Sequence, residues 1–404
     1  MRLVRIPEEK YYDYRLQAMF NCYKWDPQFF DSNTLASYAL VLSKEENEEL
    51  IRLTESIDKE TIQAEEYLNE HFNHDVAKKL MLPKKIYNQI AHMKNYDSSK
   101  NIRLMRYDFH PSVQGKWVVT EVNSDVPGGF AESSLLPDLA RKMIGNNDLT
   151  YKSFGEEMVK AVLNKVKKGS NIMMVHCTCY SDDRQVMQYM GDRLAKEGYN
   201  ILYGAADHIN FKDGKAYIIH DNQKVDIDNI FRFTPIEWLI DMKPRRWDGY
   251  FTGDLCACNH PIAIYAQTKR FPFIWDGLEK NGIKMNTWRE LLPETIEVKD
   301  SLNREGFIFK PVYGRVGERI SIKEACKGDE YSKIMKDVKK HPKYYLAQKK
   351  FESKPIDGEN DEKYHLCLGS YTIDGKHSGF YARISNVPRI DSHAADVPVL
   401  VEGE

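Results

Sequence analysis

Hydrophobic and polar residues alternate in two short segments of Arg103–Ser134. The apolar positions of the two segments are Leu104, Met105 and Tyr107, then Trp117, Val118, Val119 and Val122. Gln114-Gly115 supplies a turn between them, so the pattern predicts a β-hairpin. Side chains two positions apart share one face of a strand. Arg106 and Asp108 therefore point the same way, as do Glu121 and Asn123, and strand pairing would gather them on one face.

The acidic side chains of this hairpin need a counter-charge. Two carboxylates about 5 Å apart repel by roughly 3 kcal/mol at an effective dielectric constant of about 20, and Arg106 can neutralise one of them. Mg²⁺ prefers carboxylate and amide oxygens and keeps positions for water and phosphate oxygens. Asp108, Glu121 and Asn123 are therefore candidate Mg²⁺ ligands. From the hairpin alone, a solvated polar face with one cross-strand salt bridge is an equally good interpretation.

The segments before and after the hairpin give a mixed α/β pattern. Ser43, followed by Glu46, predicts the start of a long helix that runs to Phe72, and we expect residues 1–100 to form a helical region. After the hairpin, an apolar strand, a helix and a second strand predict a βαβ unit, and a two-stranded meander follows. The βαβ unit comprises strand Asn171–Cys177, helix Asp183–Glu197 and strand Asn200–Gly204. The meander strands are Lys215–His220 and Ile227–Phe233.

The last third of the chain combines lysines with a short glycine loop. Pro261–Asn281 has a helical pattern with Lys269 near its middle, and Pro272 should divide it into two helices. Phe307–Val312 is an apolar strand that carries Lys310, and Ile320–Ile322 is expected to be the next strand. A hairpin of His365–Ile373 and His377–Ile384 closes the pattern.

Lys310 is costly to bury without an anion. Gly314 and Gly317 follow it, and glycines let backbone N–H groups approach phosphates closely. The segment is not a P-loop, because the G-x-x-x-x-G-K-[ST] pattern is absent. The arrangement favours a nucleotide site over the alternative of a salt-bridged strand lysine beside an ordinary turn.

Composition narrows the class of protein. The 404 residues carry a net charge of −2, which gives no reason to expect nucleic acid or an anionic membrane as a partner. No apolar stretch approaches the length of a membrane span, and the first residues lack a signal-peptide pattern, so we expect a cytoplasmic protein. Of the seven cysteines, four form two C-x-C pairs, Cys177/Cys179 and Cys256/Cys258. Structural thiols are favoured over a zinc site shared by these pairs.

Three segments together resemble a known family. FIFKPVYGRVGERI resembles the strand–loop–strand of ATP-grasp ligases, TKRFPFIWDGLEKNGIKMN resembles their lysine helix, and YLAQKKF resembles the strand that receives adenine. The E-x-N motif in EVNSDVPG lies upstream of these elements instead of downstream. That permuted order resembles the glutathionylspermidine synthase family, without the amidase domain that some members carry.

The resemblance implies an α/β fold with α+β elements: an ATP-grasp fold with a pre-ATP-grasp βαβ domain and an N-terminal helical region. It implies four parts. Residues 1–100 would be helical, and 101–150 would hold the metal-binding hairpin of a permuted core. Residues 151–260 would be the pre-ATP-grasp domain, and 261–404 would bind the nucleotide.

The resemblance also implies roles for single residues. Asp108, Glu121 and Asn123 would hold Mg²⁺, as two ions, while Arg106 and Arg315 would be catalytic. Arg106, Glu237 and Arg383 would bind the substrates. The ATP-binding positions would be Lys269, Lys310, Gly314, Val316, Gly317, Gln348, Lys349 and Lys350.

The implied activity is that of a C–N ligase. ATP would convert a small-molecule or peptide carboxylate to an acyl phosphate, and an amine would displace the phosphate. After the E-x-N motif the family commonly has Ala-Asp and small hydroxyl residues, whereas this chain has Ser-Asp-Val-Pro-Gly at 124–128. The sequence therefore leaves the acid, the amine and the oligomeric state open. The alternatives are a non-catalytic nucleotide-binding scaffold and a Mg²⁺-dependent phosphohydrolase.

Overall fold

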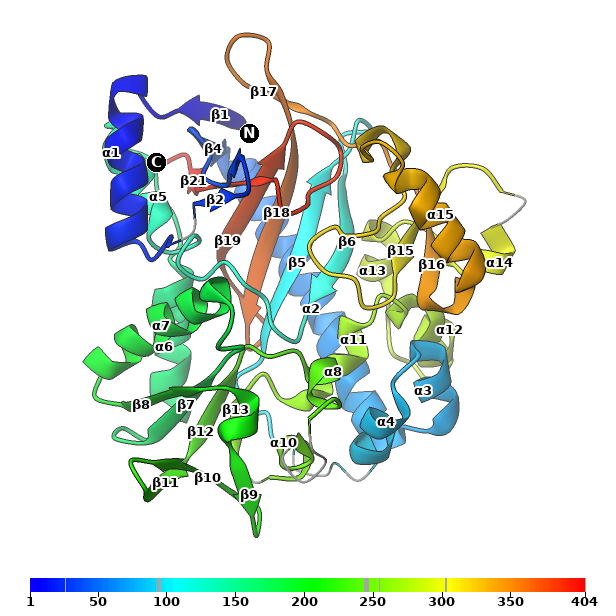
Figure 1. The fold of residues 1–404 in the computed structure, drawn as a ribbon. Helices are drawn as coiled ribbons and strands as arrows, with labels where there is room; N and C mark the ends of the chain where they lie inside the picture. Colours follow the sequence, from blue (N-terminus) through cyan, green and yellow to red (C-terminus); the bar gives the residue numbers. More distant parts are fainter. Residues whose placement is uncertain are drawn as a thin grey trace.

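A computed structural model describes residues 1–25, 27–91, 93, 96–242, 247–253, 255–301 and 304–403. Within these residues, no helix combines the length and the apolar character needed to cross a membrane. Figure 1 shows a six-stranded antiparallel sheet at the centre, with the other units arranged around it.

The central sheet has the strand order β20-β19-β18-β5-β6, and β17 also pairs with β18. Its strands are β5 (Leu104–Pro111), β6 (Trp117–Asn123), β17 (Ile356–Asp357), β18 (Lys363–Ile373), β19 (Lys376–Ser385) and β20 (Ala395–Val397). Both predicted hairpins are confirmed, as β5–β6 and β18–β19. The pairing of β5 with β18 joins a segment from the first third of the sequence and one from the last third in one sheet.

One face of this sheet is apolar and is covered by helix α2 (Lys44–His71). The predicted helix start is confirmed, because the Ser43 hydroxyl accepts from Glu46 N and the Glu46 carboxylate accepts from Ser43 N. Leu50, Leu53 and Ile57 of α2 are buried against the sheet. The opposite face is polar, and it carries the side chains of the candidate site.

A parallel sheet of order β13-β12-β7-β8 confirms the predicted βαβ unit. It comprises β7 (Asn171–Val175), β8 (Asn200–Gly204), β12 (Asn229–Arg232) and β13 (Cys256–Cys258), with helices α6 (Phe154–Lys165) and α7 (Ser181–Lys196). The expected meander is partly wrong, because β12 pairs with β7 in this sheet. The antiparallel unit is instead β9 (Asn210–Lys212), β10 (Lys215–His220) and β11 (Gln223–Ile227).

A third sheet, of order β14-β16-β15, stands beside the polar face (right-hand side of Figure 1). Its strands are β14 (Thr295–Ile296), β15 (Phe307–Pro311) and β16 (Tyr345–Lys349). The neighbouring helices are α11 (Ile264–Gln267), α12 (Trp275–Lys280), α13 (Asn286–Leu291), α14 (Val298–Ser301) and α15 (Glu330–Lys340), with the 3₁₀ helices η2 (Pro261–Ala263), η3 (Phe271–Ile274), η4 (Lys323–Ala325) and η5 (Pro342–Tyr344).

Two expectations for this region are wrong. Ile320–Ile322 does not form a strand; Ser321 N donates one bond to Phe309 O, and Ile322 N bonds back to Ile320 O. Lys269 lies in a turn between α11 and η3 rather than in mid-helix. The helix already ends at Gln267, ahead of Pro272, because the Gln267 side chain is held by Ser124 N and Asp125 N.

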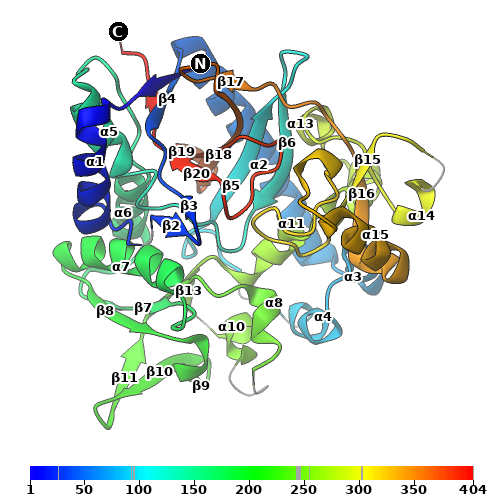
Figure 2. The ribbon, with the colours of Figure 1, turned by 45° about the horizontal axis from the view of Figure 1, so that its top comes forward.

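The first 100 residues contain strands as well as helices, so the expectation of a purely helical region is wrong. The helices are α1 (Glu8–Asn21), α2, α3 (His74–Leu80) and α4 (Lys84–Ile90), and the short strands are β2 (Gln28–Phe29) and β3 (Ser32–Asn33). Strands β1 (Arg2–Arg5) and β4 (Tyr38–Leu42) form a sheet with β21 (Val399–Val401). Figure 2 shows the two ends of the chain close together at this sheet. The remaining helices are α5 (Leu136–Ile144), which packs on α1, α8 (Ile236–Leu239), α10 (Gly249–Thr252) and η1 (Ala206–His208).

Candidate active site

The register of β5 and β6 places the predicted polar residues opposite one another. Arg106 lies across from Asn123, and Asp108 lies across from Glu121. A bulge follows Asp108, and bulges change the direction of the side chains beyond them. The four residues share the polar face with Tyr381 and Arg383 of β19, because Gly369 of β18 pairs with both Asp108 and Tyr381.

Two ion pairs organise this face. Arg106 donates from Nε to Asp108 Oδ1 at 2.8 Å and from Nη2 to Asp108 Oδ2 at 3.1 Å. Asn123 Nδ2 also donates to Asp108 Oδ2, at 3.0 Å. Glu121 pairs with Lys269 at 2.8 Å. The predicted hairpin cluster and the predicted lysine are therefore brought together in space.

A third cation makes the cluster net positive. Lys310 is 5% exposed, and no carboxylate lies within 4 Å of its ammonium among the described residues. Burial would raise the pKa of Glu121, but Lys269 and Lys310 outweigh it and hold that pKa at about 2. Burial lowers the pKa of Lys310 to about 8, against the attraction of Glu121. Three cations and two carboxylates leave one positive charge for an anion.

The glycine loop 314–317 lies against this cluster. Lys269 Nζ donates to Gly314 O at 2.5 Å. Gly317 has a φ of +65°, and a Cβ there would lie 2.4 Å from Ile390 O. Val316 also has a positive φ, and its side chain is exposed. The loop therefore lies between Lys269 and the segment 389–391. This close approach requires glycine at position 317, because any side chain there would collide with the backbone of Ile390.

Arg315 and Glu237 meet although they come from different units. Arg315 Nη2 donates to Glu237 Oε1 at 2.5 Å, and its guanidinium lies 5.5 Å from the Trp238 ring centroid. Glu237 belongs to α8, which lies in the chain between strands β12 and β13 of the parallel sheet. Glu237 Oε2 and Arg315 Nε are both buried without a hydrogen-bond partner. A buried polar atom without a partner is costly, so both atoms are suited to receive a ligand.

Arg383 is a further cation, and it lies with Arg106 on the polar face of the central sheet. Its Nη1 donates to Asp391 O at 3.4 Å, and its Nε is buried without a partner. Among the described residues, no carboxylate lies within 4 Å of its guanidinium. Neighbouring Tyr381 is otherwise engaged: its hydroxyl donates to Asp396 at 2.6 Å, and its ring lies 5.0 Å from the Arg106 guanidinium.

A small cavity lies between β6, the Lys269 turn and the third sheet, and Glu121, Lys269, Lys310 and Gln348 line it. Gln348 is buried and donates to Thr295 Oγ1 at 3.2 Å. Its walls combine apolar side chains with the buried Gln348 amide, and its volume of about 20 Å³ is that of a single water molecule.

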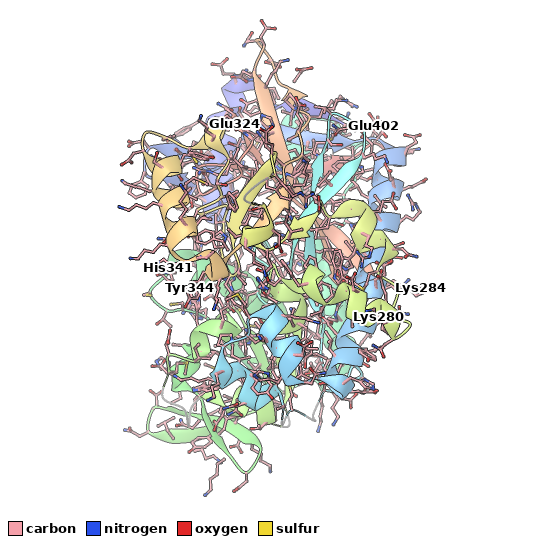
Figure 3. All side chains as sticks on the ribbon, turned by 90° about the vertical axis from the view of Figure 1, so that its right-hand side faces the viewer. Lys280, Lys284, Glu324, His341, Tyr344 and Glu402 are labelled. Carbon is pink, nitrogen blue, oxygen red and sulfur yellow. The ribbon has the colours of Figure 1, made fainter. Side chains whose placement is uncertain are left out.

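Five of the eight predicted ATP positions do not line this cavity: the loop residues Gly314, Val316 and Gly317, and the strand residues Lys349 and Lys350. Lys349 N and Lys350 N donate to Glu294 O and Gly306 O. The Lys350 side chain pairs with Glu324, which Figure 3 labels near the top of the molecule.

Sequence reasoning missed a buried support beneath the hairpin. Asp125 pairs with Arg232 and accepts from Ile236 N at 2.7 Å, so it fixes the start of α8 and with it Glu237. Asn259 Nδ2 donates to Ser124 O at 2.8 Å. An arginine at the end of an apolar strand, Ile230-Phe231-Arg232, was the available signal, because such a residue needs a buried partner.

The donor set can be tested for Mg²⁺. Glu121 uses one carboxylate oxygen for Lys269, and no hydrogen bond to its other oxygen or to Asn123 Oδ1 is found in the described part of the chain. Both Asp108 oxygens accept from Arg106, so the second Glu121 oxygen and Asn123 Oδ1 are the better-suited ligands for a hard cation that keeps waters. No group of three or more His, Cys, Asp or Glu residues suited to a metal is found among the described residues.

One solved structure shares this fold over nearly the whole chain. A glutathione synthetase-like effector from Globodera pallida superimposes with a TM-score of 0.62 at 13% identity, over 97% of this chain and 96% of that chain. A putative gamma-glutamylcysteine synthetase from Methylobacillus flagellatus gives a TM-score of 0.41 at 12% identity, over 86% and 87% of the two chains. No protein with curated function matches the sequence significantly.

A family model named glutathionylspermidine synthase pre-ATP-grasp matches residues 15–402, nearly the whole chain. The match extends over the E-x-N hairpin, the βαβ unit and the glycine loop alike. This chain therefore belongs to the glutathionylspermidine synthase pre-ATP-grasp family.

Proposed function

We propose that the protein is an ATP-dependent carboxylate–amine ligase. The observation that carries the proposal is the polar face itself, where Asp108 and Glu121 stand opposite each other among Arg106, Lys269 and Lys310. Such a cluster suits an anionic ligand that binds as a complex with a metal ion. In this proposal, residues 261–404 bind the nucleotide and the hairpin of 101–150 presents the metal ligands.

The chain's own residues would bind and orient the nucleotide. Lys269 and Lys310 hold its phosphates, the loop 314–317 covers them, and Gln348 meets the adenine. Asp108, Glu121 and Asn123 would hold Mg²⁺, which neutralises phosphate charge when bound. The Glu121–Lys269 pair and the Lys269–Gly314 bond show that these elements already lie within hydrogen-bonding distance.

The chemistry follows from where positive charge is available. An oxygen of the substrate carboxylate attacks the γ-phosphorus, and ADP leaves with the bond electrons. The amine nitrogen then attacks the acyl carbon, phosphate leaves, and one proton is released from the nitrogen. Arg106 is placed to stabilise the negative charge of both steps, because its buried guanidinium is fixed by Asp108 and Gly128 O.

The two substrates would meet at Arg383 and Glu237. Arg383 is an anchor for a second carboxylate of the acid, since its buried Nε has no partner. The free oxygen of Glu237 can accept from an ammonium. A separate cavity of about 1020 Å³ is lined by Glu318, Arg389 and Asp391, and neither Arg383 nor Glu237 lines it, so it gives no measure of the substrate's size.

ADP release tests the proposal. Wild type and Glu121→Gln are incubated with Mg²⁺ and ATP against pools of amino acids, small peptides and polyamines. We expect release that needs both a carboxylate and an amine pool and that disappears in the variant. ADP release by wild type that needs neither pool would favour a phosphohydrolase. Tight ATP binding without any release would favour a scaffold. Near-normal turnover in Glu121→Gln would exclude the metal assignment.

A further inference from the structure

The two C-x-C pairs have the same spacing but different backbones. Cys256 and Cys258 lie in strand β13, where alternate residues are about 6.6 Å apart along the chain. Cys177 and Cys179 lie in a β-turn, because Tyr180 N donates to Cys177 O at 3.1 Å. A turn shortens the path between its residues, so the second pair can approach.

The sulfur atoms of the turn pair are already in contact. Cys177 Sγ and Cys179 Sγ are 3.4 Å apart, and no such contact between Cys256 and Cys258 is found among the described residues. Cys179 is exposed and Cys177 is half-buried, whereas Cys258 is buried. An accessible thiol with a second thiol in contact is the arrangement of an attacking and a resolving cysteine.

We propose that Cys177 and Cys179 are a thiol modification site, which low-molecular-weight disulfides oxidise reversibly to an intrachain disulfide. The Cys179 thiolate attacks one sulfur of the small disulfide, whose S–S bond breaks and releases one thiol. Cys177 then attacks the Cys179 sulfur and releases the second thiol. Two protein thiols are oxidised, one small disulfide is reduced to two thiols, and no other reactant is needed.

The order of attack follows from exposure. Burial, together with the contact to Cys179, raises the pKa of Cys177, so Cys177 is a poor first nucleophile. As the second nucleophile it acts within the molecule, where proximity compensates for a small thiolate fraction. Ring closure in a three-residue loop is strained, and strained exposed disulfides are the easily reduced ones.

The turn is joined to helix α7 by a hydrogen bond. Asp183, near the start of α7, accepts from Cys177 N at 3.3 Å. Burial raises the pKa of Asp183 to about 6, and the hydrogen bond from Cys177 N opposes this rise. Oxidation of the turn would therefore act on a backbone that is hydrogen-bonded to helix α7.

The test uses the full-length native protein and 2-hydroxyethyl disulfide as the oxidant. Samples are quenched in acid, remaining thiols are alkylated, and tryptic peptides are weighed. Peptide 169–184 contains the turn pair alone, and peptide 247–269 contains the strand pair alone. We expect peptide 169–184 to lose two hydrogen atoms and both alkylation sites about tenfold faster than peptide 247–269, and the loss to reverse with dithiothreitol.

Two variants and one control separate the proposal from simple exposure. Cys177→Ser should trap a stable mixed disulfide on Cys179, and Cys179→Ser should leave Cys177 largely alkylatable. In urea the two peptides should oxidise at similar rates, because the turn is lost. Equal rates in the native protein, or a wild-type peptide 169–184 that stays as a mixed disulfide with Cys177 free, would overturn the proposal. None of these readouts depends on ligase activity.

Discussion

Glu121 Oε2 lies 2.8 Å from Lys269 Nζ, and the same ammonium donates to Gly314 O. Lys269 thus joins the β5–β6 hairpin to the glycine loop. Lys269→Met removes both contacts and one positive charge that we propose binds phosphate. We expect ATP to bind about tenfold more weakly or worse, measured by isothermal titration calorimetry at fixed Mg²⁺.

Lys160→Met is the matched control for this variant. Lys160 also pairs with a glutamate, Glu157 at 2.7 Å, but on the exposed surface of α6. Its loss should leave ATP affinity unchanged, since surface pairs contribute little. If Lys269→Met bound ATP as tightly as Lys160→Met does, the phosphate role of Lys269 would be wrong.

Lys310 should make ATP binding depend on pH. Burial lowers its pKa to about 8, so the ammonium is present at pH 7 and mostly lost at pH 9. ATP affinity should fall over that interval in wild type and stay flat, but weaker, in Lys310→Met. Lys349→Met removes an exposed lysine of the same sheet and should retain the wild-type pH profile.

The same residue should cost stability in the absence of ligand. The pKa of Lys310 is about 8 in the folded protein and 10.5 as its ordinary value, so between these pH values the unfolded chain binds more protons. Stability then rises with pH from about 8 to 10.5, and the cost is fully present below 8. Lys310→Met should raise the free energy of unfolding at pH 7 by up to roughly 3 kcal/mol, measured by urea denaturation. A less stable variant would contradict this.

The hairpin of the site could be predicted because its signals are local. Residues two apart share a face, and Gln114-Gly115 marks the turn, so the alternation predicts Asp108 and Glu121 on one face. Their direct opposition depends on the strand register, which shifts at the bulge after Asp108 and was not predicted. The glycine loop beside Lys310 could be predicted from the local sequence in the same way. The pairing of Lys269 with Glu121 could not, because no periodicity relates residues so distant in the chain. The family resemblance assigned Lys269 to ATP and Glu121 to Mg²⁺, but it did not predict their ion pair.

Other features depend on tertiary contacts that override local pattern. Lys269 has a helical context in the sequence, yet the helix ends at Gln267, whose side chain is bound by the loop after β6. Tyr38–Leu42 is a continuous apolar run, which is the signal of a buried strand, but its partners β1 and β21 come from the two ends of the chain. Such pairings between distant segments determine the fold, but no pattern in the local sequence predicts which strands will pair.

Arg103 should be important for stability rather than for catalysis. On the α2 side of the central sheet it donates to Asp58 at 2.6 Å and to Glu65 at 2.7 Å. Arg103→Met leaves two buried carboxylates without a counter-charge and should cost about 3–5 kcal/mol in urea denaturation. As a control, Arg52→Met replaces an exposed arginine of helix α2 and should change stability little. A neutral Arg103→Met would contradict the assignment.

Glu65 adds a pH signature to this network. Burial raises its pKa to about 7, above the ordinary value of 4.5, so between these values the folded protein binds the extra proton. The Glu65 contribution to stability therefore declines as pH rises from about 4.5 to 7. Glu65→Gln cannot titrate and should flatten the stability profile over this interval. An unchanged slope would show that Glu65 is not the titrating group.

Gly317 should be required for the closed position of the glycine loop. Its φ is +65°, and a Cβ would lie 2.4 Å from Ile390 O, a backbone atom that no rotamer change can move. Gly317→Ala should push the loop away from segment 389–391 and draw Arg315 from Glu237. We expect ATP affinity to fall about tenfold, measured by calorimetry.

Gly328→Ala separates this clash from backbone strain. Gly328 also has a positive φ, of +54°, but a Cβ there would meet nothing within 4 Å. It should lose about 1 kcal/mol of stability from the left-handed conformation and bind ATP normally. Because both variants carry the same strain, only the contact with Ile390 distinguishes them. Equal ATP affinities in the two variants would mean that the loop does not need this contact to cover the nucleotide.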